Sequence, residues 1–171
     1  MSAAEPATSL DVEVFRHQAG MIRAVVGMNT EGMTQADSLV KPEPAGNCAN
    51  WVLGHVLCVY NNALGLLGQE RVVPADGLER YKRGSAPLAD TAEALDFGEM
   101  VAAWDRTCDA VDAGLAQLGP DGLDRPAPFS PSGNPNETMR SLISTVLFHQ
   151  TYHAGQLGLL RRIAGKPGAI P

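Results

Sequence analysis

The clearest structural signal in the chain lies in residues 97–118, which read FGEMVAAWDRTCDAVDAGLAQL. Apolar side chains recur there at alternating spacings of four and three residues, at Phe97, Val101, Trp104, Cys108, Val111, Leu115 and Leu118. This spacing places them on one narrow face of a helix and is typical of a helix packed in a bundle. Asp90 and Glu93 form a capping-box pattern ahead of the stripe, and Gly119 with Pro120 follows it. We therefore predict a helix over residues 90–118.

Three further segments have helical character. Clusters of Gly and Pro separate them, in residues 40–46, 69–87 and 119–135. The helices are expected over residues 9–32, 47–67 and 134–165. Asn134 is the expected N-cap of the last helix, with Pro135 at its first position. Because no useful β-alternation appears, we predict an all-α four-helix bundle in a single domain spanning residues 1–171, with room for crossover connections.

Composition excludes several classes of protein. The chain has 171 residues, 44% of them hydrophobic, and a formal net charge of −6, which suits one globular domain and argues against nucleic-acid binding. No stretch is apolar enough for a membrane helix, and residues 1–11 lack the features of a signal peptide. The three cysteines form no C-x-x-C pair, so neither a disulfide framework nor a zinc knuckle is indicated. We expect a cytoplasmic protein that acts on a small molecule, without a nucleic-acid or membrane partner.

Histidines occupy apolar positions on two of the expected helices. His149 and His153 are four residues apart, so a helix places both imidazoles on one face. His55 lies on the apolar stripe of residues 47–67. Each could be a core histidine bonded to a carbonyl or hydroxyl group, but one shared metal ion would compensate all three. We predict that His55, His149 and His153 bind a divalent transition metal such as zinc, nickel or iron.

Two known classes of helical metal site do not match this pattern. Zinc proteases of the H-E-x-x-H type need a Glu after the first histidine as general base, and Gln150 stands there. Carboxylate-bridged di-iron sites need a Glu three residues before a histidine, and no histidine of this chain has one. The sequence therefore predicts a site of imidazoles with open positions, and it identifies no catalytic base.

Neighbouring residues are candidates for supporting roles. Gln156 shares a helix face with His153, and we expect it to orient that ligand. Cys58 and Cys48 lie close to His55 in the sequence, although a free cysteine is more often a small core residue.

Other residues have two interpretations. His17 would be a fourth ligand only if its side of the first helix faced inward. Trp51 and Trp104 are expected in the core, where either could wall a pocket. The basic loop side chains, Arg71, Arg80, Lys82 and Arg83, could bind an anionic substrate or thiol, but a solvated loop is the simpler interpretation.

Motifs in the chain resemble signatures of the DinB/YfiT-like superfamily. Residues 50–55 (NWVLGH) resemble its W-x-x-G-H motif, residues 148–156 (FHQTYHAGQ) its H-x-x-x-H-x-G-Q helix, and residues 81–87 (YKRGSAP) the loop before its third helix. The resemblance spans residues 9–165. It implies a four-helix bundle, a frequent homodimer, and a metal held by three histidines that correspond to His55, His149 and His153. Members include bacillithiol-dependent transferases and a mycothiol-dependent maleylpyruvate isomerase, which implies a low-molecular-weight thiol cosubstrate.

These observations favour a metal-dependent enzyme with thiol transferase or isomerase chemistry. Binding to a divalent cation would lower the pKa of a thiol or a water and produce a nucleophile at neutral pH. The alternatives are a metal-dependent hydrolase and a non-catalytic, stress-related bundle that binds a metal or a small molecule. The acidic charge argues against a nuclease or DNA-binding function.

Overall fold

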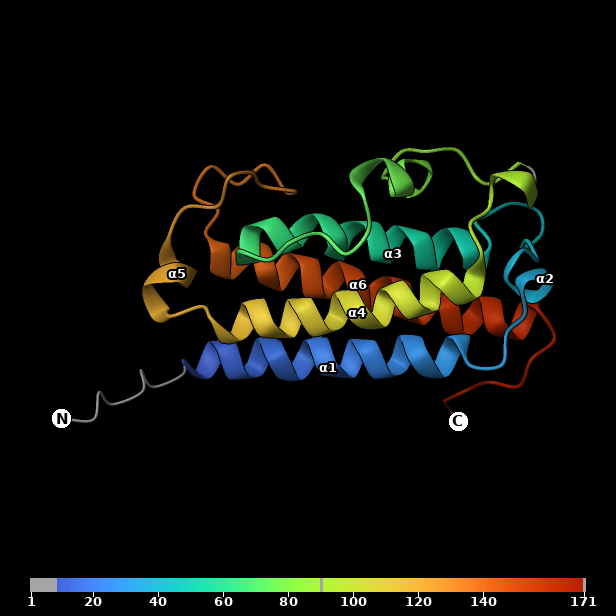
Figure 1. The fold of residues 1–171 in the computed structure, drawn as a ribbon, viewed down its shortest axis with the longest axis horizontal. Helices are drawn as coiled ribbons and strands as arrows, with labels where there is room; N and C mark the ends of the chain where they lie inside the picture. The colour runs from blue at the N-terminus through green and yellow to red at the C-terminus, as the bar shows by residue number, and fades with distance from the viewer. Residues whose placement is uncertain (1–8, 90, 171) are drawn as a thin grey trace.

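Four long helices form the body of the computed structural model, which describes residues 9–89 and 91–170 (Figure 1). They are α1 (Leu10–Thr30), α3 (Ala49–Ala63), α4 (Phe97–Ala116) and α6 (Met139–Ile163). The connections contain the shorter elements α2 (Gln35–Ser38), η1 (Leu64–Leu67), η2 (Ala75–Tyr81), η3 (Thr91–Glu93) and α5 (Pro120–Asp124). Within the described residues, β-pairing is limited to one isolated bridge between Pro126 and Thr138. The predicted all-α class is confirmed.

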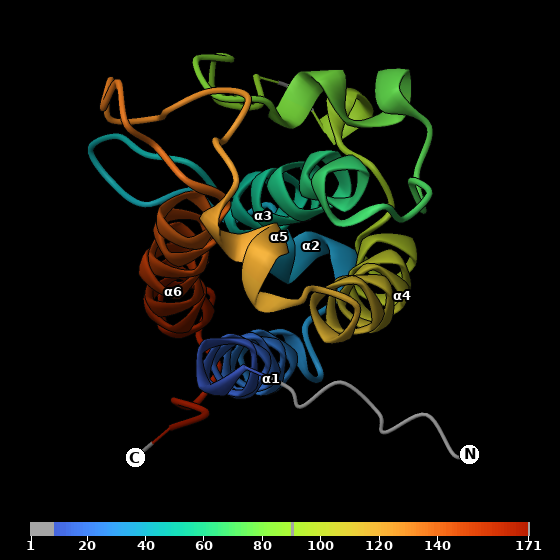
Figure 2. The same ribbon diagram turned by 90° about the vertical axis from the view of Figure 1, so that its left-hand side faces the viewer.

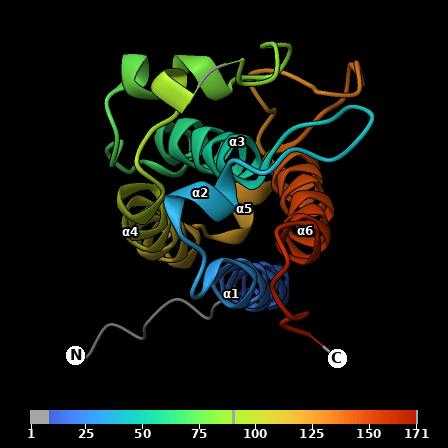
Figure 3. The same cartoon turned by 90° about the vertical axis from the view of Figure 1, so that its right-hand side faces the viewer.

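The order of the helices around the bundle requires long crossovers. Both α1 and α3 pack against α4 and α6, so α1 and α3 are diagonal to each other (Figure 2). Helices α1 and α6 run in one direction, and α3 and α4 run in the other (Figure 1). Because α3 and α4 are parallel neighbours, the chain must return along the whole length of the bundle between them. The return segment, residues 64–89 and 91–96, lies over the outer side of α3 (Figure 3).

Because of this return segment, α3 is buried on two sides. Residues 49–58 of α3 are all buried, although a bundle helix usually buries one stripe. The bundle covers its inner side, and the segment containing η2 packs on its outer side. The single apolar stripe that the sequence indicates for this helix is therefore narrower than its buried surface.

Helix α6 begins later than residue 134. Thr138 is its N-cap: the Thr138 hydroxyl accepts a hydrogen bond from the backbone N–H of Ser141 at 3.2 Å, and the Ser141 hydroxyl accepts one from the N–H of Thr138 at 3.0 Å. The Asn134 carboxamide instead accepts a bond from the N–H of Asn136 at 3.0 Å, which closes a local turn. Two capping patterns stand close together here, and the one next to the buried Met139 begins the helix.

Helix α4 shows the same kind of shift. It begins at Phe97, and the Asp96 carboxylate accepts a hydrogen bond from the N–H of Glu99 at 2.9 Å. The predicted cap at Asp90 lies outside the described residues, and residues 91–93 form the separate turn η3. The expectation of one helix over 90–118 is therefore wrong at its start, because residues before 97 belong to the segment that covers α3.

The apolar stripes predicted for the later helices agree with the core to different degrees. On α4, Trp104, Cys108, Val111 and Leu115 are buried as expected, and Trp104 stacks on Tyr60 with ring centroids 5.2 Å apart. On α6, Leu142, Leu157 and Leu160 are buried as the apolar stripe predicts, but the middle of the buried line runs through Leu147, Gln150 and Ala154, which leaves His149 and His153 half-buried at its edge. In the described part of the chain, no helix is both long enough and apolar enough to cross a membrane.

Candidate metal centre

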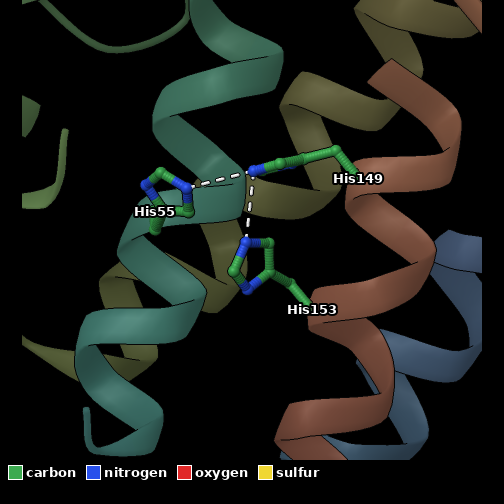
Figure 4. A group of neighbouring side chains, drawn as sticks. All are labelled: His55, His149 and His153. Atoms are coloured by element: carbon green, nitrogen blue, oxygen red, sulfur yellow. Dashed lines mark hydrogen bonds between the residues drawn. The ribbon is translucent and has the colours of Figure 1, made fainter. Parts of the chain in front are cut away.

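Three histidines converge between α3 and α6 (Figure 4). His55 comes from the middle of α3, and His149 and His153 come from successive turns of α6. The Nε2 atom of His149 lies 3.2 Å from Nε2 of His55 and 3.1 Å from Nε2 of His153. Ligand atoms of all three side chains lie within 4.8 Å of one another, close enough to hold one metal ion.

The spacing of these nitrogens fits the coordination sphere of a first-row transition metal. With metal–nitrogen bonds of about 2.0–2.1 Å, two imidazole nitrogens would be about 3.3 Å apart on a tetrahedral ion and about 2.9 Å apart on an octahedral one. The two observed separations, 3.2 and 3.1 Å, fall between these values. The separations from His149 to each of the other two histidines therefore already suit a shared ion, and the whole set lies within 4.8 Å.

The hydrogen-bond partner of His55 fixes its tautomer. Its Nδ1 lies 2.7 Å from the backbone carbonyl oxygen of Tyr81. Because a carbonyl can only accept, the proton of the neutral ring is on Nδ1, which donates it. Nε2 of His55 therefore carries a lone pair that points at the other two histidines.

The two α6 histidines are held in the same tautomer. Gln150 donates from its amide nitrogen to the carbonyl of Val56 at 2.9 Å, which turns its Oε1 toward Nδ1 of His149, at a longer 3.4 Å. Oε1 of Gln156 accepts from Nδ1 of His153 at 2.7 Å. All three Nδ1 atoms thus face acceptors, and with the ring protons on Nδ1 the three Nε2 lone pairs would point toward one another. Such an arrangement is unfavourable by itself and becomes favourable around a cation.

Burial keeps the three imidazoles neutral. It is the main cause of a lowered pKa at each histidine, and it takes the pKa of His153 to about 4, with a contribution from its neighbours His149 and His55. The positive charge of Arg83 also lowers the pKa of His149. At neutral pH, protons therefore compete little with a metal for the Nε2 atoms.

Gly54 allows the contact that orients His55. A Cβ built on Gly54 would lie 2.2 Å from Cδ1 of Tyr81, so the ring of Tyr81 rests directly on the α3 backbone. The Tyr81 hydroxyl donates to Oδ1 of Asn50 at 2.9 Å and accepts from the N–H of Leu95 at 2.8 Å. These contacts hold the Tyr81 carbonyl against His55.

Trp51 packs on the other side of this histidine. Its ring is stacked on that of His55, with centroids 4.9 Å apart and an interplanar angle of 16°. Asn50, Trp51, Gly54 and His55 of the NWVLGH stretch therefore act together to fix one imidazole.

Other residues considered from the sequence lie elsewhere. His17 is exposed on α1, whose inner face carries Phe15 and Ile22, so a role as fourth ligand is wrong. In the described residues, the metal-binding group contains no cysteine. Cys58 is buried, its Sγ accepts from the Asn62 amide at 3.5 Å, and burial raises its pKa. The thiol is therefore held in its protonated form, as in a core residue.

Sequence reasoning missed two residues that position the histidines. In the sequence, Gln150 serves only to exclude a zinc protease, because it stands where the catalytic Glu would be. In the structure it is fully buried and connects α6 to α3. Tyr81 contributes a backbone carbonyl, which any residue type could supply, so its side chain carried no signal. The glycine before His55 was the one available clue to a close neighbour.

Two cavities flank the histidines along the groove between α3 and α6. The first, called here the Arg83 cavity, has a volume of about 530 Å³, and its lining includes His55, Val59, Leu66, Arg83, Phe129 and His149. The second, the Trp51 cavity, has a volume of about 420 Å³, and its lining includes Pro42, Trp51, Tyr152, His153, Gln156 and Leu160. The candidate metal centre thus has a cavity on each side.

The lowered pKa values predict how the metal-free protein responds to acid. The unfolded state binds protons near the ordinary histidine pKa of about 6.5, whereas the folded state resists them, down to about 4 at His153. The neutral histidines therefore make their full contribution to the free energy of unfolding above pH 6.5. That contribution is lost as the pH falls from about 6.5 to about 4. Denaturant titrations with chelator at pH 7 and 5 should show a lower free energy of unfolding at pH 5, and His153→Gln should reduce the difference. An unchanged free energy in the native chain would contradict the neutral cluster.

Gly54→Ala should disturb the metal site through Tyr81. The added methyl group would displace the ring and the carbonyl that orients His55, so zinc affinity should fall about 10- to 100-fold, as when an outer partner of a ligand is lost. Competition with a chromophoric chelator measures the affinity. Gly20→Ala on α1 is the matched control, because its Cβ would meet nothing within 4 Å. Equal zinc affinities in the two variants would exclude the proposed role of Gly54.

Comparison with known proteins agrees with this architecture. The sequence profile described as the DinB superfamily matches residues 22–157. Among curated proteins, no sequence matches the chain. The fold is similar to the crystal structure of a conserved protein from Enterococcus faecalis, with a TM-score of 0.71, 14% identity, and coverage of 95% of this chain and 100% of the other. The family match spans most of the chain, including all three histidines, and the chain belongs to the DinB superfamily.

Proposed function

We propose that this protein is a metal-dependent enzyme that transfers a thiol sulfur to an electrophile, or uses the thiol to assist an isomerisation. His55, His149 and His153 would hold the ion. The observation that carries the proposal is the convergence of three histidine Nε2 atoms between two cavities. Structural zinc sites usually have four protein ligands, whereas three histidines leave a position for a reacting group.

The surroundings of the site favour a thiol over water as nucleophile. A divalent ion bound there would lower the pKa of a thiol or water in its open position. Among the described residues that line the two cavities, none is an aspartate or glutamate that could act as general base. A free thiol has an ordinary pKa of about 8.5 against about 15.7 for free water, so the thiol depends less on the ion to lose its proton to solvent. This difference supports transferase chemistry over hydrolysis.

The protein's own residues would orient the reaction. Tyr81, Gln150 and Gln156 keep the imidazole lone pairs directed at one point. The stacked Trp51 ring fixes the plane of His55 and walls the second cavity. The thiol sulfur would lose its proton to solvent and form a bond to the electrophilic carbon, and the electron pair of the broken bond would leave with the departing group.

Metal binding and thiol binding test the proposal together. Protein purified without a histidine tag should bind about one Co²⁺ per chain, and 2-mercaptoethanol should then produce a thiolate-to-cobalt charge-transfer band. The double variant His149→Ala/His153→Ala should lose both signals, and His17→Ala, on the exposed face of α1, should keep both. Turnover with 1-chloro-2,4-dinitrobenzene, which releases chloride, should follow the same pattern.

Two results would contradict the proposal at different points. Less than about 0.2 ion per chain, unchanged in the double variant, would refute the metal centre. Full metal binding without a charge-transfer band or metal-dependent turnover would instead indicate a non-catalytic metal-binding bundle.

A further inference from the structure

The return segment carries four cations close together in sequence, and the structure separates their roles. The Arg80 guanidinium bonds to the Glu93 carboxylate at 2.8 Å and to the carbonyl oxygens of Ala86 and Pro87 at 2.7 and 2.9 Å. Lys82 forms an ion pair with Glu79. Their charges are already compensated by groups of the segment itself. Neither residue lines the Arg83 cavity, and nor does Arg71.

Arg83 differs from these neighbours in its position at the cavity and in its lack of an ion pair among the described residues. It lines the cavity together with His55 and His149, and its charge is close enough to lower the pKa of His149. In the described part of the chain it forms no ion pair, whereas Arg80 and Lys82 do. The cavity lining contains no aspartate or glutamate among the described residues. Among the described residues, Arg83 is therefore a positive charge beside the candidate metal centre without an anionic partner.

The rest of the cavity is mainly apolar. Val59 and Leu66 of the α3–η1 segment line one side, Val146 of α6 lies opposite, and Phe129 of the loop before α6 is 55% exposed. Its volume of about 530 Å³ is within the range of small-molecule sites, roughly 300–1,000 Å³. An apolar hollow with one cation suits a ligand that has a hydrocarbon or aromatic body and a single negative charge.

We propose that the Arg83 cavity binds a carboxylate-bearing ligand, whose anionic group pairs with Arg83 and whose apolar body packs on Leu66, Phe129 and Val146. The reacting end of this ligand lies toward His55 and His149. The inference rests on the proposed function, since it assigns a charge to one of the two reactants. The Trp51 cavity has no cationic lining residue among those described, so it would take the uncharged reactant.

Paired probes that differ only in charge test this assignment. For the electrophile, the probes are 4-phenylbutyrate and 4-phenylbutyramide, measured by calorimetry on metal-free and cobalt-loaded protein. For the thiol, they are 3-mercaptopropionate and 3-mercaptopropionamide, measured by the cobalt charge-transfer band. In the native chain we expect at least one carboxylate to bind about fivefold or more tightly than its amide, as for a partly exposed ion pair. The pair that shows the preference identifies whether thiol or electrophile is the anion.

Matched variants locate the charge that is responsible. Arg83→Gln should abolish the preference while leaving the affinity for the amide and the cobalt content unchanged, and Arg83→Lys should retain part of it. Lys82→Gln, which removes the adjacent but already paired cation, should leave the preference intact. Retention of the full preference in Arg83→Gln, or the absence of any preference in the native chain, would overturn the proposal.

The two proposals fail in distinguishable ways. A chain that binds no cobalt would refute the metal-dependent function, yet calorimetry with 4-phenylbutyrate on the metal-free protein would still report on Arg83. Conversely, a normal charge-transfer band with both thiols and no effect of Arg83→Gln on any probe would leave the metal chemistry standing and remove the anion site.

Discussion

The hydrogen bond from Nδ1 of His55 to the carbonyl oxygen of Tyr81 connects the fold to the metal centre. It exists because α3 and α4 are parallel neighbours, so that the return segment passes back over the outer side of α3. That path brings Tyr81 onto Gly54, where a side chain of any size would block its ring. The carbonyl then selects one tautomer of His55 and leaves Nε2 free to bind an ion. The helix order, the glycine at position 54 and the position of the His55 proton therefore depend on one another.

The same principle operates on α6 with different chemistry. Gln150 is anchored by the Val56 carbonyl, and Gln156 bonds directly to His153, so side-chain amides take the role that a backbone carbonyl has on α3. All of these partners are neutral. Three neutral imidazoles would leave a bound metal its full charge, which would favour an anionic nucleophile there.

The sequence predicted the parts of the structure that follow from local spacing. The stripe on residues 97–118 and the four-residue step from His149 to His153 required only helical periodicity, and both appear in the structure. The starts of two helices were misplaced because competing caps lie a few residues apart, at Asn134 and Thr138 in α6. Which cap is used depends on where the core begins, and that is a tertiary property.

The partners of the histidines were harder to predict for a physical reason. A carbonyl acceptor has no residue signature, so Tyr81 could not be recognised, and the buried Gln150 resembled an ordinary polar position. The four basic residues of the return segment, Arg71, Arg80, Lys82 and Arg83, likewise cannot be told apart from the sequence. Only the structure shows that Arg80 and Lys82 are paired and that Arg83 faces the site.

X-ray absorption spectroscopy of the zinc-loaded protein tests the central claim most directly, because it reports the ligands of the ion itself. The structure predicts three imidazole nitrogens at about 2.0–2.1 Å, together with one or more oxygen ligands from solvent. Addition of a thiol should replace an oxygen with a sulfur at about 2.3 Å. A sulfur ligand before any thiol is added, or fewer than three imidazoles, would contradict the proposed centre.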